Sequence, residues 1–222
     1  MTADLQRDDC PHPSPACAPV GTRSGWRPPA RVVTHPIIGE AAPDASLADL
    51  EGREVMFSSA WRDRAAVLVF LRYFGCPLCQ RHVFDLRQGR EEFERADANV
   101  VLIGQGSAQE AGAFHDRRNL PFRCLVDDSR IAYHRYGLIQ GKLSQVFGPK
   151  VVGPLISAAL QPETRQRGLS GGHFLQMPGT FVVDAEGIVR YVHRNITIAD
   201  NPPNDPLLEV LGDLAGKRGR PV

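Results

Sequence analysis

The segment 65–80, AAVLVFLRYFGCPLCQ, constrains the fold of this chain more than any other part of the sequence. Its first seven residues are apolar and rich in Val, Leu and Phe, which predicts a strand buried on both faces of an α/β sheet. Gly75 ends this pattern, and Cys76 then stands at the expected first turn of a helix. Pro77 suits that turn, because the N–H that proline lacks would have no intrahelical partner there.

Cys76 and Cys79 form a Cys-x-x-Cys pair at this helix start, the arrangement of a redox dithiol. We expect Cys76 to be exposed, with its thiolate favoured by unpaired backbone N–H groups and the helix dipole. Cys79 shares a helical face with Val83 and Leu86 and is expected to point inward as a resolving thiol. Two structural cysteines or half a zinc site are the alternatives, but the chain has no second such pair.

Length and charge exclude several classes of protein. The 222 residues suit one domain, and a formal net charge of +1 gives no case for a general nucleic-acid or membrane-surface footprint. No stretch reaches the roughly 18 consecutive apolar residues of a membrane span. We therefore expect a cytoplasmic protein, in which a cysteine pair is more often catalytic than structural.

The N-terminal residues 1–35 are rich in proline and poor in large apolar residues, which predicts a disordered tail. Cys10 and Cys17 flank His12 in this tail. They could form a metal clip or an auxiliary thiol pair, but incidental cysteines in a flexible arm are the favoured interpretation.

Residues 36–215 are expected to form the ordered domain, followed by a flexible basic tail at 216–222. Short strands joined by turns at Pro43 and Gly52 come first. The pattern then predicts apolar strands alternating with helices, which is typical of a mostly parallel sheet covered on both faces. The expected elements are a strand at 65–71, a helix at about 76–95, a strand at 99–104, a helix at 107–119 with Ser107 and Glu110 as capping box, a strand at 122–126 and a helix at 129–136.

The second half of the domain begins with a looser segment. We interpret 141–172 as an insertion that contains one helix at about 154–161. Strands at 180–183 and 188–193 are joined by a turn and predict an antiparallel hairpin, and a helix at about 206–214 ends the domain.

This order of elements resembles the thioredoxin-like fold, and four segments resemble the peroxiredoxin-like branch of the AhpC/TSA family, which also contains prostamide/prostaglandin F synthase-like proteins. The segments are IIGEAAPDASLADLEGREV, VLVFLRYFGCPLCQRH, LPFRCLVDDSRIAYHRYGL and PGTFVVDAEGIVRYVHR. The resemblance implies a central mixed sheet flanked by helices, with Cys76 as attacking and Cys79 as resolving cysteine.

The resemblance also implies a groove beside the reactive sulfur. In thioredoxin-like proteins a cis-proline precedes the hairpin and lies against that sulfur, and Met177–Pro178 fits this position. Tyr73, Pro77 and Thr180 complete the residues expected to line or support the groove.

Two positions depart from the peroxidase pattern. Peroxiredoxins carry Thr or Ser three residues before the attacking cysteine, where this chain has Tyr73, and an arginine before the Gly-Thr-Phe-like strand, where it has Pro178. Tyr73 could donate its hydroxyl, but a packing role is favoured. Arg72, Arg81 and Arg123 are candidate substitutes for the arginine.

Three further residues carry side chains that could be functional. Cys124 alternates with Phe122 and Val126 and is expected to be a buried apolar residue. His82 is expected at the surface or its boundary. His173 is interpreted as a loop residue, with a role as base or ligand near the sulfurs as the alternative.

The resulting prediction is a thiol oxidoreductase that reduces a peroxide or endoperoxide through a Cys76/Cys79 dithiol–disulfide cycle. It would need no cofactor, and an external thiol donor such as thioredoxin would restore the dithiol. A dithiol–disulfide oxidoreductase is the main alternative. Copper binding by Cys76, Cys79 and His173 and a non-catalytic redox sensor are further alternatives, and the oligomeric state, including a homodimer, stays open.

Overall fold

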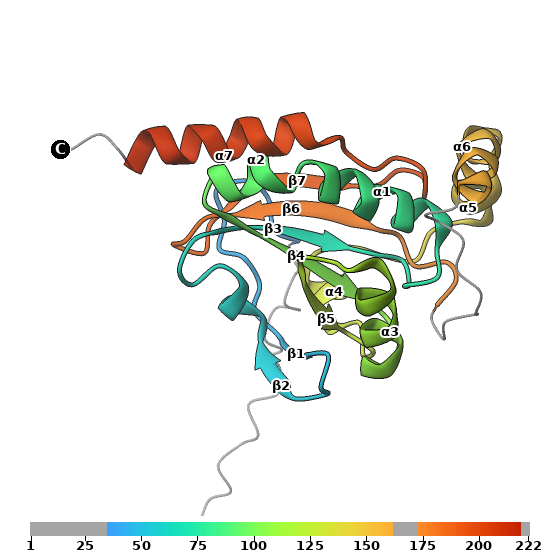
Figure 1. Ribbon diagram of the computed structural model, residues 1–222, viewed down its shortest axis with the longest axis horizontal. Helices are drawn as coiled ribbons and strands as arrows, with labels where there is room; N and C mark the ends of the chain where they lie inside the picture. The colour runs from blue at the N-terminus through green and yellow to red at the C-terminus, as the bar shows by residue number, and fades with distance from the viewer. Residues whose placement is uncertain (1–34, 162–172, 219–222) are drawn as a thin grey trace, which may run out of the picture. The chain divides into compact units, whose positions relative to one another are not determined.

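The computed structural model describes residues 35–161 and 173–218, and the predictions for the N-terminal tail, for residues 162–172 of the insertion and for the last four residues lie outside this part. The described chain forms a mixed sheet of seven strands in the order β2-β1-β5-β4-β3-β6-β7 (Figure 1). The strands are β1 (Ser46–Ala48), β2 (Glu54–Met56), β3 (Ala65–Phe70), β4 (Ala98–Gly104), β5 (Arg123–Val126), β6 (Gly179–Val183) and β7 (Val189–Arg194).

Helices alternate with the central strands, as the sequence pattern predicts. They are the 3-10 helix η1 (Phe57–Ala60), α1 (Pro77–Gln88), α2 (Arg90–Arg95), α3 (Ala108–Arg118), α4 (Ile131–Arg135), α5 (Leu143–Phe147), α6 (Pro149–Leu160) and α7 (Asn204–Arg218). β3, β4 and β5 pair in parallel, whereas β6 pairs antiparallel with both β3 and β7. The predicted mixed sheet and its C-terminal hairpin are therefore confirmed. The mostly parallel sheet is wrong, because β1 also pairs antiparallel with β2 and β5, so that two of the six pairings between the described strands are parallel.

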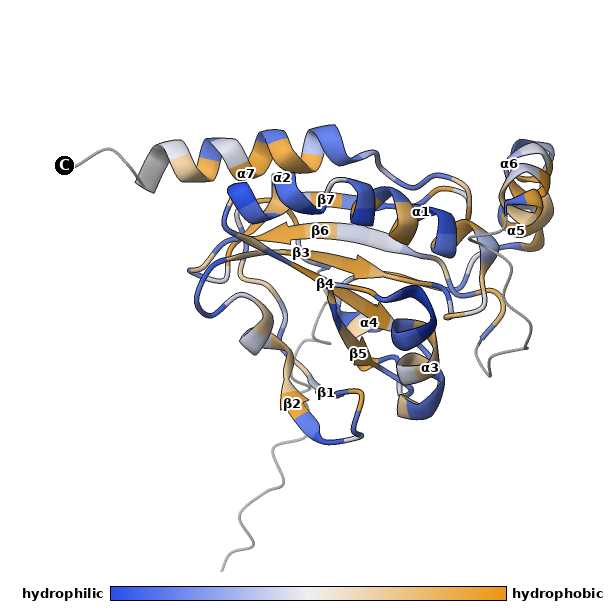
Figure 2. Ribbon diagram, viewed as in Figure 1, coloured by the Kyte–Doolittle hydropathy of each residue, from blue (hydrophilic) through white to orange (hydrophobic). Residues whose placement is uncertain are grey.

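Both faces of the sheet are buried, which explains the continuous apolar pattern of β3. All six residues of β3 are buried, and alternate side chains enter two separate clusters. Val67 and Val69 pack with α1, α3 and α7 on one face, whereas Leu68 and Phe70 pack with η1 and α4 on the other. Figure 2 shows largely hydrophobic residues along β3 and β4, whereas α1 and α3 carry many hydrophilic residues.

Several helix boundaries differ from the prediction. The helix expected at 76–95 is interrupted at Gly89, whose backbone leaves the helical conformation, in keeping with the low helix propensity of glycine. The described part of the insertion, 141–161, holds two helices where one was expected at about 154–161. Pro149 starts α6 at its first helical position, and the helix continues through Pro154. The last helix is longer than expected and includes residues 216–218, which the prediction assigned to the tail.

The capping box of α3 is confirmed. The Ser107 hydroxyl accepts the Glu110 backbone N–H at 3.2 Å, and the Ser107 backbone N–H donates to the Glu110 carboxylate at 2.9 Å. Within the described residues, no helix combines the length and the apolar composition that a membrane crossing requires.

Candidate active site

The candidate site lies where the chain leaves β3 and enters α1. Cys76 is the N-cap residue of α1, with an extended backbone, and Pro77 occupies the first helical position as predicted. The Cys76 carbonyl accepts the backbone N–H of Gln80 at 2.9 Å, which is the first hydrogen bond of the helix. The Cys76 sulfur therefore lies at the positive end of the helix dipole, where a negative charge is stabilised.

The expected exposure of Cys76 is wrong, because the start of α1 is covered. Cys76 is 0% exposed and Cys79 is 2% exposed. The segment that joins β3 to α1 folds over the helix start, with Phe74 and Arg72 both buried. Gly104 lets the Phe74 ring approach the end of β4 closely, since a Cβ at that position would lie 2.3 Å from the ring.

Arg72 connects both cysteines to the segment before β6. Its Nη1 donates to Cys76 Sγ at 3.6 Å, and its backbone N–H donates to Cys79 Sγ at 3.3 Å. Its Nε donates to the Gln176 carbonyl at 3.2 Å, and its Nη2 donates to the Phe174 carbonyl. Two backbone carbonyls thus orient a buried guanidinium toward the sulfur of Cys76.

The two thiols have opposite pKa shifts. The hydrogen bond from the Cys79 thiol is the largest cause that lowers the pKa of Cys76 to about 6; burial opposes it, and the charge of Arg72 adds to it. The pKa of Cys79 is raised well above its ordinary value, first by this hydrogen bond and then by burial. The pair therefore favours one thiolate on Cys76 and one protonated thiol on Cys79.

Aromatic rings surround the guanidinium of Arg72. The Arg72 Cζ atom lies 5.4 Å from the ring centroid of Tyr73 and 5.0 Å from the ring centroid of Phe174. The Tyr73 and Phe174 centroids are 6.3 Å apart, and Phe147 of α5 stacks on Phe174 at 5.5 Å. These contacts agree with the predicted packing role of Tyr73, and burial raises the pKa of its hydroxyl.

Two glutamines that the sequence analysis missed hold this segment in place. The Gln176 side chain donates through Nε2 to the Leu138 carbonyl at 2.6 Å. The backbone carbonyl of Gln176 accepts the hydrogen bond from Arg72 Nε. Gln105, just after β4, donates to the Arg72 carbonyl and accepts the His173 backbone N–H at 3.0 Å. Isolated glutamines in loops carry no sequence signal for such a role.

The residues expected to line the groove are placed differently from the thioredoxin pattern. The Met177–Pro178 bond is trans, because the described residues contain no cis peptide bond, so the expected cis-proline is wrong. Met177 is buried, and its backbone N–H donates to the Ile139 carbonyl at 3.3 Å. Thr180 is also buried, inside β6 between Val69 and His193.

The remaining candidates separate into site and structural residues. Of the three arginines, Arg72 contacts the sulfur, Arg81 pairs with Asp85 on α1, and Arg123 is exposed at the start of β5. Cys124 is buried as expected, and burial raises its pKa to about 12.

The structure also places the two histidines that the sequence analysis singled out. His82 is 5% exposed, so its expected surface position is wrong: the face of α1 that carries it is covered. His173 is exposed in the segment before β6. Across residues 35–161 and 173–218, no three His, Cys, Asp or Glu side chains form a cluster that could hold a metal ion. Cys76, Cys79 and His173 therefore do not form the three-ligand set that a copper site would need.

The comparisons with known proteins decide the family. The model of the AhpC/TSA family matches residues 38–192. The chain belongs to the AhpC/TSA family. Peroxiredoxin-like 2C of Bos taurus is 26% identical over 219 residues, covering 95% of this chain and 91% of that protein. Prostamide/prostaglandin F synthase of Aquarana catesbeiana is 26% identical over 174 residues, covering 75% of this chain and 83% of that protein.

The fold agrees with solved peroxiredoxin structures. Peroxidoxin BcpB of Mycobacterium tuberculosis superposes with a TM-score of 0.60 at 20% identity, over 81% of this chain and 99% of that chain. The predicted family and the thioredoxin-like fold are therefore confirmed. Peroxiredoxins are oxidoreductases, and this family member is assigned to the same enzyme class.

Proposed function

We propose that this AhpC/TSA protein reduces a peroxide or endoperoxide through a dithiol–disulfide cycle of Cys76 and Cys79. The observation that carries the proposal is the buried Arg72 guanidinium, whose Nη1 lies 3.6 Å from the Cys76 sulfur. The hydrogen bond from the Cys79 thiol and, to a smaller extent, the charge of Arg72 lower the pKa of Cys76 to about 6 against the effect of burial, so that Cys76 is mostly thiolate at neutral pH. A thiolate is the nucleophile that O–O cleavage requires.

The cycle has three balanced steps. The Cys76 thiolate attacks one peroxide oxygen and the O–O bond breaks; with a hydroperoxide this leaves a sulfenic acid on Cys76 and an alkoxide, or a hydroxide from hydrogen peroxide, which takes up a proton and leaves as an alcohol or as water. The Cys79 sulfur then attacks the Cys76 sulfur; its proton and the hydroxyl group of the sulfenic acid leave as water, and a Cys76–Cys79 disulfide forms. With an endoperoxide the attack of Cys76 leaves a sulfenate ester that joins Cys76 to the opened substrate, and attack of Cys79 on the sulfur of this ester releases the substrate as a diol and forms the same disulfide. An external dithiol reduces this disulfide and is itself oxidised.

Arg72 is proposed to replace the arginine that peroxiredoxins carry at the position of Pro178. A guanidinium offers several fixed N–H donors, so it can stabilise both the thiolate and the negative charge that develops on the departing oxygen. The carbonyls of Phe174 and Gln176 keep it in this orientation. Because Cys76 is fully buried, a bound peroxide requires neighbouring side chains to move, and Phe174, which is 47% exposed, lies beside Arg72.

The electron donor is proposed to be a thiol protein such as thioredoxin, and no prosthetic group is needed by this cycle. The cytoplasmic location stays a prediction; a reducing compartment of that kind would return the disulfide to the dithiol. A homodimer also stays a prediction, to be checked by the mass of the protein in solution.

A dithiol–disulfide oxidoreductase is the second candidate. The observation that favours it is Tyr73, which stands where the peroxidase pattern has a small hydroxyl residue and contacts Phe174 and Arg72 through its ring. A site without the small Thr or Ser side chain at this position lacks one group that orients a peroxide. Reduction of a protein disulfide uses the same thiolate and resolving thiol but needs no such group.

Stopped-flow oxidation of the reduced protein separates the two functions. Hydrogen peroxide, a bulky organic hydroperoxide and a protein disulfide are compared at equal concentrations. Rapid oxidation by a hydroperoxide, with loss of both Cys76 and Cys79 thiols, supports the proposal. Reaction with the disulfide alone would replace it with the second candidate.

Cysteine variants assign the roles within the pair. Cys76→Ser is expected to abolish turnover, and Cys79→Ser to stop the cycle with sulfenic acid or a mixed disulfide on Cys76, detected by mass spectrometry. Cys124→Ala is the matched control, because Cys124 is a buried thiol in β5, and it should keep full turnover. Equal and mild effects of the Cys76 and Cys79 changes would reject the mechanism.

A further inference from the structure

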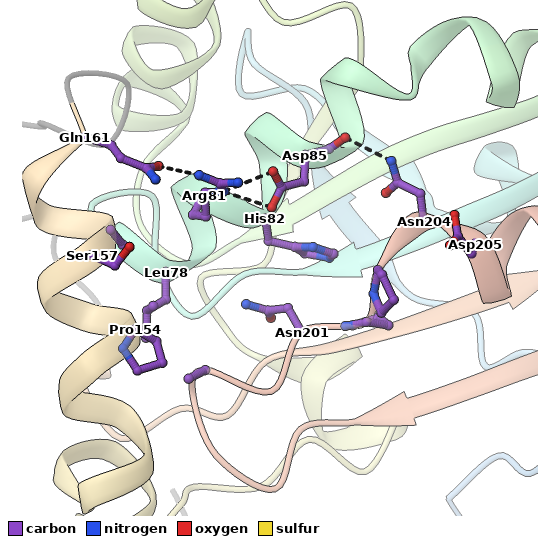
Figure 3. Close-up of a pocket in the computed structure, with 14 residues that line it drawn as sticks. Leu78, Arg81, His82, Asp85, Pro154, Ser157, Gln161, Asn201, Asn204 and Asp205 are labelled. Carbon is purple, nitrogen blue, oxygen red and sulfur yellow. Dashed lines mark hydrogen bonds and ion pairs between the residues drawn. The ribbon is translucent and has the colours of Figure 1, made fainter.

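A pocket of about 700 Å³ lies outside the dithiol site, between α1, α6 and the segment 199–205 that leads into α7 (Figure 3). Its volume falls within the range of roughly 300–1,000 Å³ that is typical of small-molecule sites. Leu78, Pro154 and Pro202 contribute apolar surface, while several polar side chains from the same three elements also line it. The pocket can therefore take a ligand with both an apolar and a polar part.

His82 of α1 supplies the first unsatisfied polar atom in this pocket. The residue is 5% exposed, and its Nε2 is buried without a hydrogen-bond partner in the described part of the chain. In Figure 3 its ring extends from α1 toward the segment that carries Asn201 and Asn204. Burial lowers the pKa of His82 to about 4, so the ring is neutral at physiological pH. A buried nitrogen of this kind is stabilised when a ligand supplies its hydrogen bond.

Asn204, the first residue of α7, supplies the second. Its Nδ2 donates to the Asp85 carbonyl at 2.9 Å, which fixes the orientation of the side-chain amide. Its Oδ1 is buried and has no partner among the residues that the structure describes. Because an amide oxygen only accepts, this atom calls for a ligand that donates a hydrogen bond.

The charged pair in the pocket already has partners. Arg81 Nε donates to both carboxylate oxygens of Asp85 at 3.0 Å, and Arg81 Nη1 donates to Gln161 Oε1 at 2.7 Å. Asp205 lies in the first turn of α7, where the helix dipole favours a carboxylate. The unmet hydrogen bonds therefore belong to neutral groups. A carboxylate ligand would find the Arg81 guanidinium already paired, and an ammonium ligand would have the exposed Asp205 carboxylate as its new partner, where an ion pair contributes little, so neither would recover its lost hydration.

We propose that this pocket binds a small uncharged molecule with a carboxamide group, whose N–H groups and carbonyl pair with Asn204 Oδ1 and His82 Nε2. A carboxamide both donates and accepts, so it can pair with His82 in either tautomer and still donate to Asn204. The apolar part of the ligand would lie against Leu78 and Pro154. This binding is independent of the redox chemistry of Cys76.

Three probes of equal chain length test the proposal on the reduced, full-length protein. Hexanamide, hexylammonium and hexanoate are titrated by calorimetry and by NMR of the histidine ring protons. Hexanamide is expected to bind one per chain and to shift the His82 resonances, with the two charged probes at least about tenfold weaker. Equal binding of all three probes, tighter binding of a charged probe, or no binding of hexanamide would overturn the proposal.

A matched pair of variants assigns binding to the pocket. His82→Phe keeps an aromatic ring but removes Nε2, and should weaken hexanamide by about tenfold. His134→Phe is the control, because His134 is exposed on α4, whose buried residues pack against the opposite face of the sheet. Unchanged hexanamide affinity in His82→Phe would reject the assignment. If that variant fails to fold, the His82 shifts of the unaltered protein decide the question.

Discussion

Replacement of Arg72 by methionine is the change that most directly tests the candidate site. The variant keeps an unbranched side chain but removes the guanidinium that donates to Cys76 Sγ and to the carbonyls of Phe174 and Gln176. The hydrogen bond from Cys79 to Cys76 would remain, while burial would act against the thiolate without the opposing charge. We therefore expect the pKa of Cys76 to rise.

The size of the effect follows from the thiolate fraction. With a pKa of about 6, Cys76 is about 90% thiolate at neutral pH. A rise to the free-cysteine value of about 8.5 would leave about 3%, so the loss of thiolate can reach about thirtyfold. Because the hydrogen bond from Cys79 persists and is the larger cause, we expect a decrease of about three- to thirtyfold in the rate of thiolate reactions.

The assay is the pH dependence of iodoacetamide alkylation of the reduced protein, with the Cys76 adduct quantified by peptide mass spectrometry. In Arg72→Met the midpoint should move to higher pH and the neutral-pH rate should fall as calculated. Arg72→Lys keeps the charge but loses the fork of donors, so an intermediate midpoint is expected. In Arg72→Met the buried Gln176 carbonyl loses its donor, at a cost of about 1–3 kcal/mol, and the partly buried Phe174 carbonyl loses its donor at a smaller cost, so circular dichroism must first establish that the variant is folded.

Arg123→Met is the control, because Arg123 is exposed at the start of β5 and does not contact the sulfurs. Its alkylation profile should match that of the unaltered protein. A folded Arg72→Met protein whose Cys76 midpoint and neutral-pH rate equal those of the control would refute the role assigned to Arg72.

Three further predictions concern stability. Gly104→Ala should lower the free energy of unfolding by about 1–3 kcal/mol, because its Cβ would lie 2.3 Å from the buried Phe74 ring; an unchanged urea midpoint would contradict this close packing. Tyr133→Phe removes a hydroxyl that donates to two buried carbonyls at 2.5 and 3.1 Å and should cost about 1–3 kcal/mol in the same assay, whereas a neutral effect would show that these bonds contribute little. Burial lowers the pKa of His82 from 6.5 to about 4, so the unfolded chain binds the proton first as the pH falls. The stability present above pH 6.5 should decrease by about 3 kcal/mol as the pH falls to 4, and His82→Phe should lack this component; parallel curves for the two proteins would contradict it.

The sequence by itself determined the fold class and the position of the dithiol. A short, continuous apolar segment such as β3 is typical of a strand that is covered on both faces of a sheet. The Gly-Cys-Pro order after it indicates where the next helix begins. The capping box of α3 and the hairpin of β6 and β7 were also predictable, because they depend on residues close together in the chain.

Only the tertiary structure decided the environment of the sulfurs. Arg72 was one of three candidate arginines, and its selection depends on carbonyls of Phe174 and Gln176, about one hundred residues further along the chain. The burial of Cys76 and His82 likewise depends on segments that pack over α1 from distant parts of the sequence. Local propensity and spacing carry no information about such contacts, because their geometry is fixed by the packing of the whole domain.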